Sequence, residues 1–167
     1  IRGEKQDNMV ESDDFIDPIT KVPVYSLYGT TRQPAPKMLD QIDAFVIDLQ
    51  DIGTRIYTFN VTMAYCMQAA KRHGKKVIVL DRPNPIDGIH TEGNVLHARF
   101  TSFVGLYPIA TRHGMTMGEL ALLFNNAFAI GCDLEVIPMK GWRRNSYADA
   151  LGRDWVCPSP NIPTFES

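Results

Sequence analysis

The stretch that decides the fold runs from Ala44 to Asp81 and reads AFVIDLQDIGTRIYTFNVTMAYCMQAAKRHGKKVIVLD. It holds two short apolar runs, at 44–50 and 76–81, with a longer segment between them. Apolar residues recur at helical steps through 58–73, which is the pattern of one buried helix face. Nearly continuous apolar runs are typical of strands covered on both faces of a parallel sheet. The stretch therefore predicts a strand, a helix and a second strand.

The two long helices that the sequence predicts have recognisable ends. Cations fill positions 71–73, where they suit the negative end of a helix dipole, and Gly74 follows as the residue that ends the first helix. The second helix begins at Thr116, with Glu119 three positions later as the partner in a capping box. We expect this helix to close at Gly131.

Further elements flank this unit on both sides. The patterns predict strands at 22–29 and 134–139 and a shorter helix over 36–42. Alternating strands and helices are the signature of the α/β class, and right-handed crossovers favour a parallel sheet between helical layers. The fold expected from the pattern is a three-layer α/β domain with a mostly parallel sheet.

Composition limits the function classes. The chain has 167 residues, of which 44% are hydrophobic and 22% charged, as in an ordinary globular domain. Its net charge of −2 gives no excess of cations to hold a nucleic acid. No run of 18 apolar residues is present to span a membrane. Three widely spaced cysteines without a C-x-x-C pair indicate structural thiols rather than a disulfide framework.

Cofactor motifs are absent from the sequence. It contains no Gly-x-Gly-x-x-Gly and no P-loop, so a nucleotide cofactor is not expected. His90 and His97 lack the spacing of metal ligands. The prediction is a protein without a metal or cofactor.

Polar residues follow three of the predicted strands, at the ends where open α/β sheets bind ligands. Thr30 to Arg32 follow the first of them. Those after the second and third are Asp48, Gln50, Asp51, Arg55, Tyr57, Asp81, Arg82 and Asn84. The segment 82–114 then shows neither a helix period nor a clean strand, and connections of that length are usually functional. Together these features predict a cleft lined with carboxylates and arginines, which suits acid–base work on a polar substrate.

Several of these residues have a structural interpretation as well. A carboxylate at Asp48 needs a partner, so an ion pair with Arg82 or Arg55 is an alternative to catalysis. Asp51 could cap the segment that leads into the next helix, and Asp81–Pro85 could be only a rigid turn. Glu92 is a lone acid in a long loop. The segment 112–114 could bind an anion before a helix N-terminus or could be a plain surface loop.

Longer strings resemble a bacterial family that was formerly a domain of unknown function and is now associated with exo-β-N-acetylmuramidase activity. They match its pattern in order and spacing over nearly the whole chain. The strings are Tyr25–Gly29, Asp48–Thr58, Leu80–Gly88, Thr91–Gly93, Ser102–Pro108, Arg112–Ala121, Gly141–Arg143 and Pro158–Thr164.

The resemblance implies a Rossmann-like domain that is followed by a second, smaller domain, with the active cleft near their junction. Residues 1–167 are then a single Rossmann-like domain, truncated at both ends relative to the family. The family pattern has Pro-Glu-His-Gly just before the position of Arg2, and this segment and the C-terminal domain lie outside the sequence. The missing domain is expected to complete the cleft.

The resemblance also implies a function. We expect a glycoside hydrolase that releases N-acetylmuramic acid from the non-reducing ends of peptidoglycan fragments, in cell-wall turnover and in a periplasmic or secreted setting. Such chemistry usually needs two carboxyl groups, and the candidates are Glu92, Asp48 and Asp51. The lactyl carboxylate of muramic acid calls for an arginine, with Arg55, Arg82 and Arg112 as candidates. Residues that could contact the sugar are Gln50, Asn84, Asn161, Tyr57 and, beside Arg112, His113.

Two other function classes remain open from the sequence. One is a non-catalytic module that binds muropeptides through the arginine-lined cleft. The other is a nucleotide-dependent Rossmann enzyme, which the missing phosphate-binding loop disfavours.

Overall fold

The centre of the fold is a three-stranded parallel sheet. The computed structural model describes residues 13–152, 154–159, 161–164 and 166–167. The strand order is β3–β4–β5, formed by Ala44–Ile47, Lys76–Leu80 and Asp133–Ile137. This arrangement confirms the α/β class and the parallel sheet.

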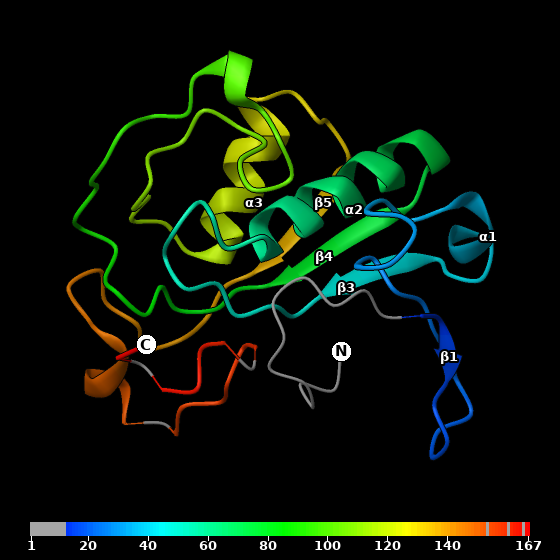
Figure 1. Cartoon of the computed structure of the whole chain (residues 1–167), viewed down its shortest axis with the longest axis horizontal. Helices are drawn as coiled ribbons and strands as arrows, with labels where there is room; N and C mark the ends of the chain where they lie inside the picture. The colour runs from blue at the N-terminus through cyan, green and yellow to red at the C-terminus, as the bar shows by residue number, and fades with distance from the viewer. Residues whose placement is uncertain (1–12, 153, 160, 165) are drawn as a thin grey trace.

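Two helices connect these strands and lie on the same face of the sheet, α2 (Phe59–His73) between β3 and β4 and α3 (Met117–Asn126) between β4 and β5 (Figure 1). The strands are added in one direction, and right-handed crossovers then place successive helices on one side. Of the three expected layers, the described residues supply the sheet and one helical layer.

The hydrophobic core fills the space between the sheet and the two helices. Side chains that point from β4 toward the helices, such as Val77 and Val79, are fully buried, as are Met67 of α2 and Leu120 of α3. The opposite face of the sheet is more open. There Val46 is 62% exposed.

The helix ends follow their sequence signals, with two differences of length. Gly74 ends α2 in the left-handed conformation, with a φ of 62°, and Thr116 and Glu119 form the expected capping box at the start of α3. The prediction that this helix closes at Gly131 was wrong. The Asn125 side chain pairs with the backbone N–H and C=O of Cys132, at 2.9 and 3.2 Å, so the chain turns into β5 earlier.

The short helix α1 is also shorter than predicted. It spans Pro36–Leu39, and its last hydrogen bond runs from the N–H of Asp40 to the carbonyl of Pro36.

The predicted first strand, at 22–29, was wrong as a member of the parallel sheet. Only β2 (Pro23–Val24) is extended, and it pairs antiparallel with β1 (Phe15–Ile16) in a separate hairpin. The next residues turn away because the Tyr28 hydroxyl bonds to two threonine hydroxyls at the start of α2, with O···O distances of 2.8 and 3.0 Å. The carboxyl edge of the sheet is therefore built from the chain after β3, β4 and β5. Residues 30–32, which were predicted to follow a strand of this sheet, do not.

The long segment after β4 is largely irregular, as predicted. It contains one short 3-10 helix, η1 (Ala98–Phe100), and isolated antiparallel bridges. A second 3-10 helix, η2 (Ala148–Leu151), follows β5. Two of the bridges join Arg112 to Thr54 and to Glu92, so the segment returns to the chain that follows β3.

Candidate active site

The first two predicted site residues that meet are Asp48, the residue after β3, and Arg82, the second residue after β4. The Arg82 guanidinium donates from Nε and from one terminal nitrogen to the two carboxylate oxygens of Asp48, at 2.6 and 2.9 Å. Both side chains are 46% exposed. The hydrogen bond from Arg82 lowers the pKa of Asp48. The ion-pair alternative is thus confirmed, and Asp48 is ionised near neutral pH and unsuited to donate a proton.

Two amide side chains fasten the loops that carry this pair. The Gln50 amide nitrogen donates to the carbonyls of Asp51 and Pro83, at 2.7 and 2.8 Å. Asn84 is 1% exposed and bonds to the carbonyl of Met115 and the N–H of Ile86. Both residues were predicted to contact the sugar. Gln50 instead joins the loops after β3 and β4, and the buried Asn84 joins the two ends of the connection between β4 and α3.

Asp51 and His113 form a buried pair beneath these loops, with exposed fractions of 2% and 4%. The Asp51 carboxylate accepts hydrogen bonds from the N–H of Gly53, at 2.7 Å, and from His113 Nε2, at 3.1 Å. His113 Nδ1 accepts the N–H of Met115, so the proton of a neutral ring is on Nε2. The structural interpretation of Asp51 holds: its carboxylate caps the segment that leads into α2 through the N–H of Gly53, while the N-cap of the helix itself is Thr58.

Arg55 lies inside the loop structure. The residue is 8% exposed. One of its guanidinium nitrogens donates to the carbonyls of Asn94 and Ile109, at 2.8 and 2.6 Å. Its own N–H bonds to the carbonyl of Thr111. Arg55 thereby fastens the long connection to the chain after β3, and is poorly placed to clamp a substrate carboxylate.

Glu92 and Arg112 form the second ion pair of the site. Their backbones exchange two hydrogen bonds, at 3.1 and 2.9 Å, and the Arg112 guanidinium donates to one carboxylate oxygen of Glu92 at 2.7 Å. The Glu92 side chain is 63% exposed, whereas that of Arg112 is 19% exposed. Glu92 is therefore a solvent-accessible carboxylate on a fixed backbone. Arg112, predicted to bind the substrate, is largely engaged with the protein itself.

Tyr57 and Asn161 lie in segments that meet near this region. Burial raises the pKa of Tyr57 to about 12, and the neighbouring side chain of Ser159 partly offsets the rise. Asn161 is exposed in the turn that the N–H of Ile162 closes on the carbonyl of Ser159. The segment after β5 thus returns to the loop that follows β3.

A chain of contacts joins the two ion pairs. The loop of Asp48 is bonded through Gln50 to the loop of Arg82, and Ile86 of that loop accepts a hydrogen bond from Arg112. Arg112 in turn holds Glu92. The structure therefore connects Asp48, Arg82 and Glu92 in one network at the carboxyl ends of the strands.

Sequence reasoning missed Asp87 as a residue of this network. Asp87 is 1% exposed and its carboxylate accepts a hydrogen bond from Arg112, at 2.9 Å. Tyr147, also missed, accepts one from the same guanidinium nitrogen at 3.3 Å. The only signal in the sequence was the Asp–Gly turn at 87–88, which says nothing of a partner 25 residues away.

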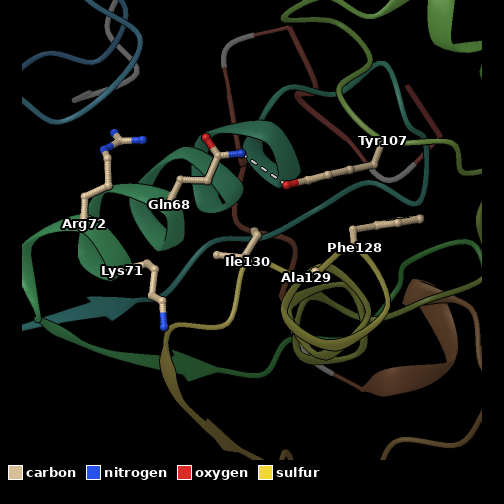
Figure 2. Close-up of a pocket in the computed structure, with 7 residues that line it drawn as sticks. All are labelled: Gln68, Lys71, Arg72, Tyr107, Phe128, Ala129 and Ile130. Carbon is tan, nitrogen blue, oxygen red and sulfur yellow. Dashed lines mark hydrogen bonds between the residues drawn. The ribbon is translucent and has the colours of Figure 1, made fainter.

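A hollow of about 270 Å³ lies elsewhere on the molecule (Figure 2). Its walls come from the second half of α2, the chain after α3 and Tyr107, whose hydroxyl accepts a hydrogen bond from Gln68. Because α2 returns the chain to the beginning of β4, this hollow is at the opposite end of the sheet from the predicted cleft. The lining residues are Gln68, Lys71, Arg72, Tyr107, Phe128, Ala129 and Ile130.

Two kinds of feature are not found in the described part of the chain: a cluster of metal-ligating side chains and a helix that could span a membrane. Among those residues no group of three histidine, cysteine, aspartate or glutamate side chains is arranged to hold a metal ion. No helix within the same ranges is long and apolar enough to cross a membrane.

Comparison with known proteins identifies relatives across the chain. Residues 1–166 match the family model described as exo-beta-N-acetylmuramidase NamZ, N-terminal. The peptidoglycan beta-N-acetylmuramidase NamZ of Bacillus subtilis (strain 168) is 53% identical over 167 residues, which are all of this chain and 40% of that protein.

Two solved structures from Bacteroides fragilis NCTC 9343, both of DUF1343 family proteins, share the fold. One is 47% identical and superposes with a TM-score of 0.87, covering 90% of this chain and 40% of the other. The second is 37% identical with a TM-score of 0.72, covering 78% and 36%. The chain thus spans about two-fifths of the length of these relatives. By the match over nearly its whole length, this chain belongs to the family of NamZ N-terminal domains.

Proposed function

We propose that the protein containing this chain is a glycoside hydrolase that releases N-acetylmuramic acid from the non-reducing ends of peptidoglycan fragments. Membership of the NamZ family and the name of the Bacillus subtilis relative support the substrate class. The structural observation that carries the proposal is Glu92, an accessible carboxylate held by an arginine at the carboxyl edge of the sheet.

The three candidate carboxylates differ in what they can reach. Asp51 is buried and bonded to His113, so its role is to hold the loop rather than to contact substrate. Asp48 is kept ionised by Arg82. Glu92 is exposed, and Arg112 donates to only one of its carboxylate oxygens. Glu92 is therefore the carboxyl group that we assign to the reacting glycosidic bond.

Arg82 is the arginine best placed to bind the lactyl carboxylate of muramic acid. It is half exposed, and Asp48 orients its guanidinium through two hydrogen bonds while one terminal nitrogen makes no bond to the described residues. An arginine fork that is oriented in advance recognises a carboxylate with good geometry. Arg55 and Arg112 are engaged with carbonyls and carboxylates of the protein.

Kinetics with a chromogenic N-acetylmuramide test the catalytic assignment in the full-length protein. Glu92→Gln should lower kcat by about 10²–10⁴-fold, because a positioned acid or base typically contributes that much. Glu135→Gln is the matched control, since Glu135 is also an exposed glutamate paired with a cation, Lys76, on the open face of the sheet. Wild-type kcat in the Glu92→Gln protein would remove Glu92 from the reaction.

The same assay tests recognition of the lactyl group. Arg82→Ala should raise KM for the muramide by about 10–100-fold, since a hydrogen bond to a charged group contributes about 1.5–3 kcal/mol. Affinity for N-acetylglucosamine, which lacks the lactyl carboxylate, should stay unchanged. Arg99→Ala, at an exposed arginine over Phe100, is the control. An equal loss for both sugars would contradict this role of Arg82.

The cellular role follows from the substrate. Peptidoglycan lies outside the cytoplasmic membrane, so we propose a periplasmic or secreted protein that acts in cell-wall turnover and recycling. Fractionation of the native organism checks this: the protein should be found with the exported fraction, and recovery in the cytoplasm alone would contradict it.

A further inference from the structure

Asp87 is a buried carboxylate near the proposed active site, and both of its oxygens accept hydrogen bonds. One oxygen accepts the backbone N–H groups of Ile89 and His90, at 2.8 and 2.9 Å. The other accepts His90 Nδ1 at 2.7 Å and the Arg112 guanidinium at 2.9 Å. Its side chain is 1% exposed. Such a carboxylate is a fixed anchor for whatever it binds.

The backbone at Asp87 is held in an uncommon conformation, with a φ of 71°. Aspartate tolerates this left-handed region because its short side chain bonds to the local backbone, as it does here to Ile89 and His90. Backbone strain of this kind persists where surrounding structure fixes it, and such positions cluster at functional sites. The conformation aims the carboxylate at Arg112.

Arg112 connects this anchor to Glu92. One terminal guanidinium nitrogen donates to Asp87, to the carbonyl of Ile86 and to the hydroxyl of Tyr147, and the other donates to Glu92. The planar guanidinium has a rigid fork of donors, so fixing one nitrogen also fixes the direction of the other. Glu92 is the exposed end of the series and Asp87 is the buried end.

From this geometry we infer that Asp87 is a positioning residue, which fixes the Glu92 carboxylate through the guanidinium of Arg112. The inference rests on the proposed function, because it assigns Glu92 to the reaction. It also changes the expected role of Arg112, from a clamp on the substrate to the group that holds Glu92. Displacements near 1 Å of a catalytic group can cost about 10²-fold in rate, which is why an anchor distant from the substrate matters.

Kinetics of the full-length protein test the inference first. Asp87→Asn keeps the shape and tolerates the left-handed backbone, but it leaves Arg112 without its buried anion. It should lower kcat by about 10–100-fold and change KM by less than about 2-fold, because orientation rather than binding is lost. Arg112→Lys should behave alike, since a single ammonium cannot reproduce the fork.

The pH profile separates positioning from a general loss of structure. The limb of the kcat/KM profile that Glu92→Gln abolishes should move to lower pH in Asp87→Asn, because the positive charge of Arg112 is then no longer balanced from behind. Asp81→Asn is the control, since Asp81 also accepts two hydrogen bonds, from Thr116 and Gly118, but faces α3. It should reduce stability and leave that limb in place. An unshifted limb in Asp87→Asn with unchanged kcat would overturn the inference.

A second measurement does not depend on turnover. The full-length protein is labelled with ¹⁵N-arginine, and the guanidinium signals of Arg112 are assigned by their loss in Arg112→Lys. In the wild-type protein these signals should show slow rotation of the guanidinium group. Asp87→Asn should abolish this slow rotation. If Glu92→Gln keeps full activity while this signal changes as expected, the catalytic assignment fails and the anchoring stands. If the Arg112 signal is the same in Asp87→Asn, the anchoring fails whatever the activity.

Discussion

Asp48 and Asp87 each pair with an arginine, but they differ in burial and therefore in how much they contribute to the free energy of unfolding. The Asp48 pair is half exposed, and exposed pairs contribute about 0–1 kcal/mol. Asp87 is buried. Burial alone would raise the pKa of Asp87, but hydrogen bonds from His90, Tyr147 and Ile89 outweigh it and hold the pKa well below its usual value.

The sign of the pH dependence follows from these lowered pKa values. A carboxylate whose pKa is lower in the folded protein adds stability above its unfolded pKa of about 3.9, and loses it as the pH falls toward the folded value. Asp87→Asn should lower the free energy of unfolding at pH 7 by about 3 kcal/mol, near the cost of breaking a buried ion pair. Asp48→Asn should lower it by less than about 1 kcal/mol.

Urea unfolding of the wild-type and variant proteins at pH 7, 5 and 3 measures both effects. The difference between wild type and Asp87→Asn should be full at pH 7 and 5 and should shrink at pH 3. A difference that grows on acidification would contradict the lowered pKa of Asp87.

Among the connections between elements, the loop that follows β3 depends on Gly53 for its shape. Its φ is 83°, and a Cβ there would lie 2.6 Å from the Asn84 carboxamide oxygen and still closer to Ile86. Gly74, which ends α2, has a φ of 62° but no atom within 4 Å of the same position. Both glycines adopt a left-handed backbone conformation. Only Gly53 also leaves no room for a side chain.

This pair of glycines gives a matched prediction. Gly74→Ala should destabilise by about 1–2 kcal/mol, the cost of the left-handed conformation alone. Gly53→Ala should cost about 3 kcal/mol or more, because overpacking adds about 1–3 kcal/mol to the same conformational cost. Chemical denaturation of both variants checks this, and equal losses would show that the loop yields to the new methyl group.

In the molecule as a whole, the proposed sugar site has exposed groups of this chain, Glu92 and Arg82, on one side. Ligand sites are concave, bury most of the ligand and often lie between domains. The relatives continue well beyond the part that this chain matches, which is 40% of the Bacillus subtilis protein. The wall opposite Glu92 and Arg82 is therefore expected from the rest of the full-length protein.

The rate of muramide hydrolysis should differ between residues 1–167 alone and the full-length protein. The longer polypeptide should hydrolyse the muramide, and the isolated chain should be slower by at least about 10²-fold, since the closed geometry that orients substrate is lost. Calorimetry with N-acetylmuramic acid accompanies the assay. Equal turnover by both would show that the cleft is complete in this chain, and binding without turnover in the full-length protein would favour a muropeptide-binding module.

How much the sequence determined varies with the range of the interactions. The strands predicted at 44–50 and 76–81 form at 44–47 and 76–80, and the helix predicted over 58–73 forms at 59–73. The start of α3 was also predicted, because periodicity, capping and glycine act over a few neighbouring residues. The edge of the sheet that gathers polar groups was also predicted, because parallel strands end together.

Only the tertiary structure decided what these polar groups do. Residues 25–29 looked like a strand but pack against α2, since Tyr28 finds its hydroxyl partners at Thr58 and Thr62. From the sequence, Arg55, Arg82 and Arg112 were equivalent candidates to bind the substrate. In the structure, Arg55 and Arg112 are bonded to residues 54 and 20 positions away. The partners of a buried charge are set by which loops come together. Local pattern identifies the groups that need such a partner, while long-range packing chooses it.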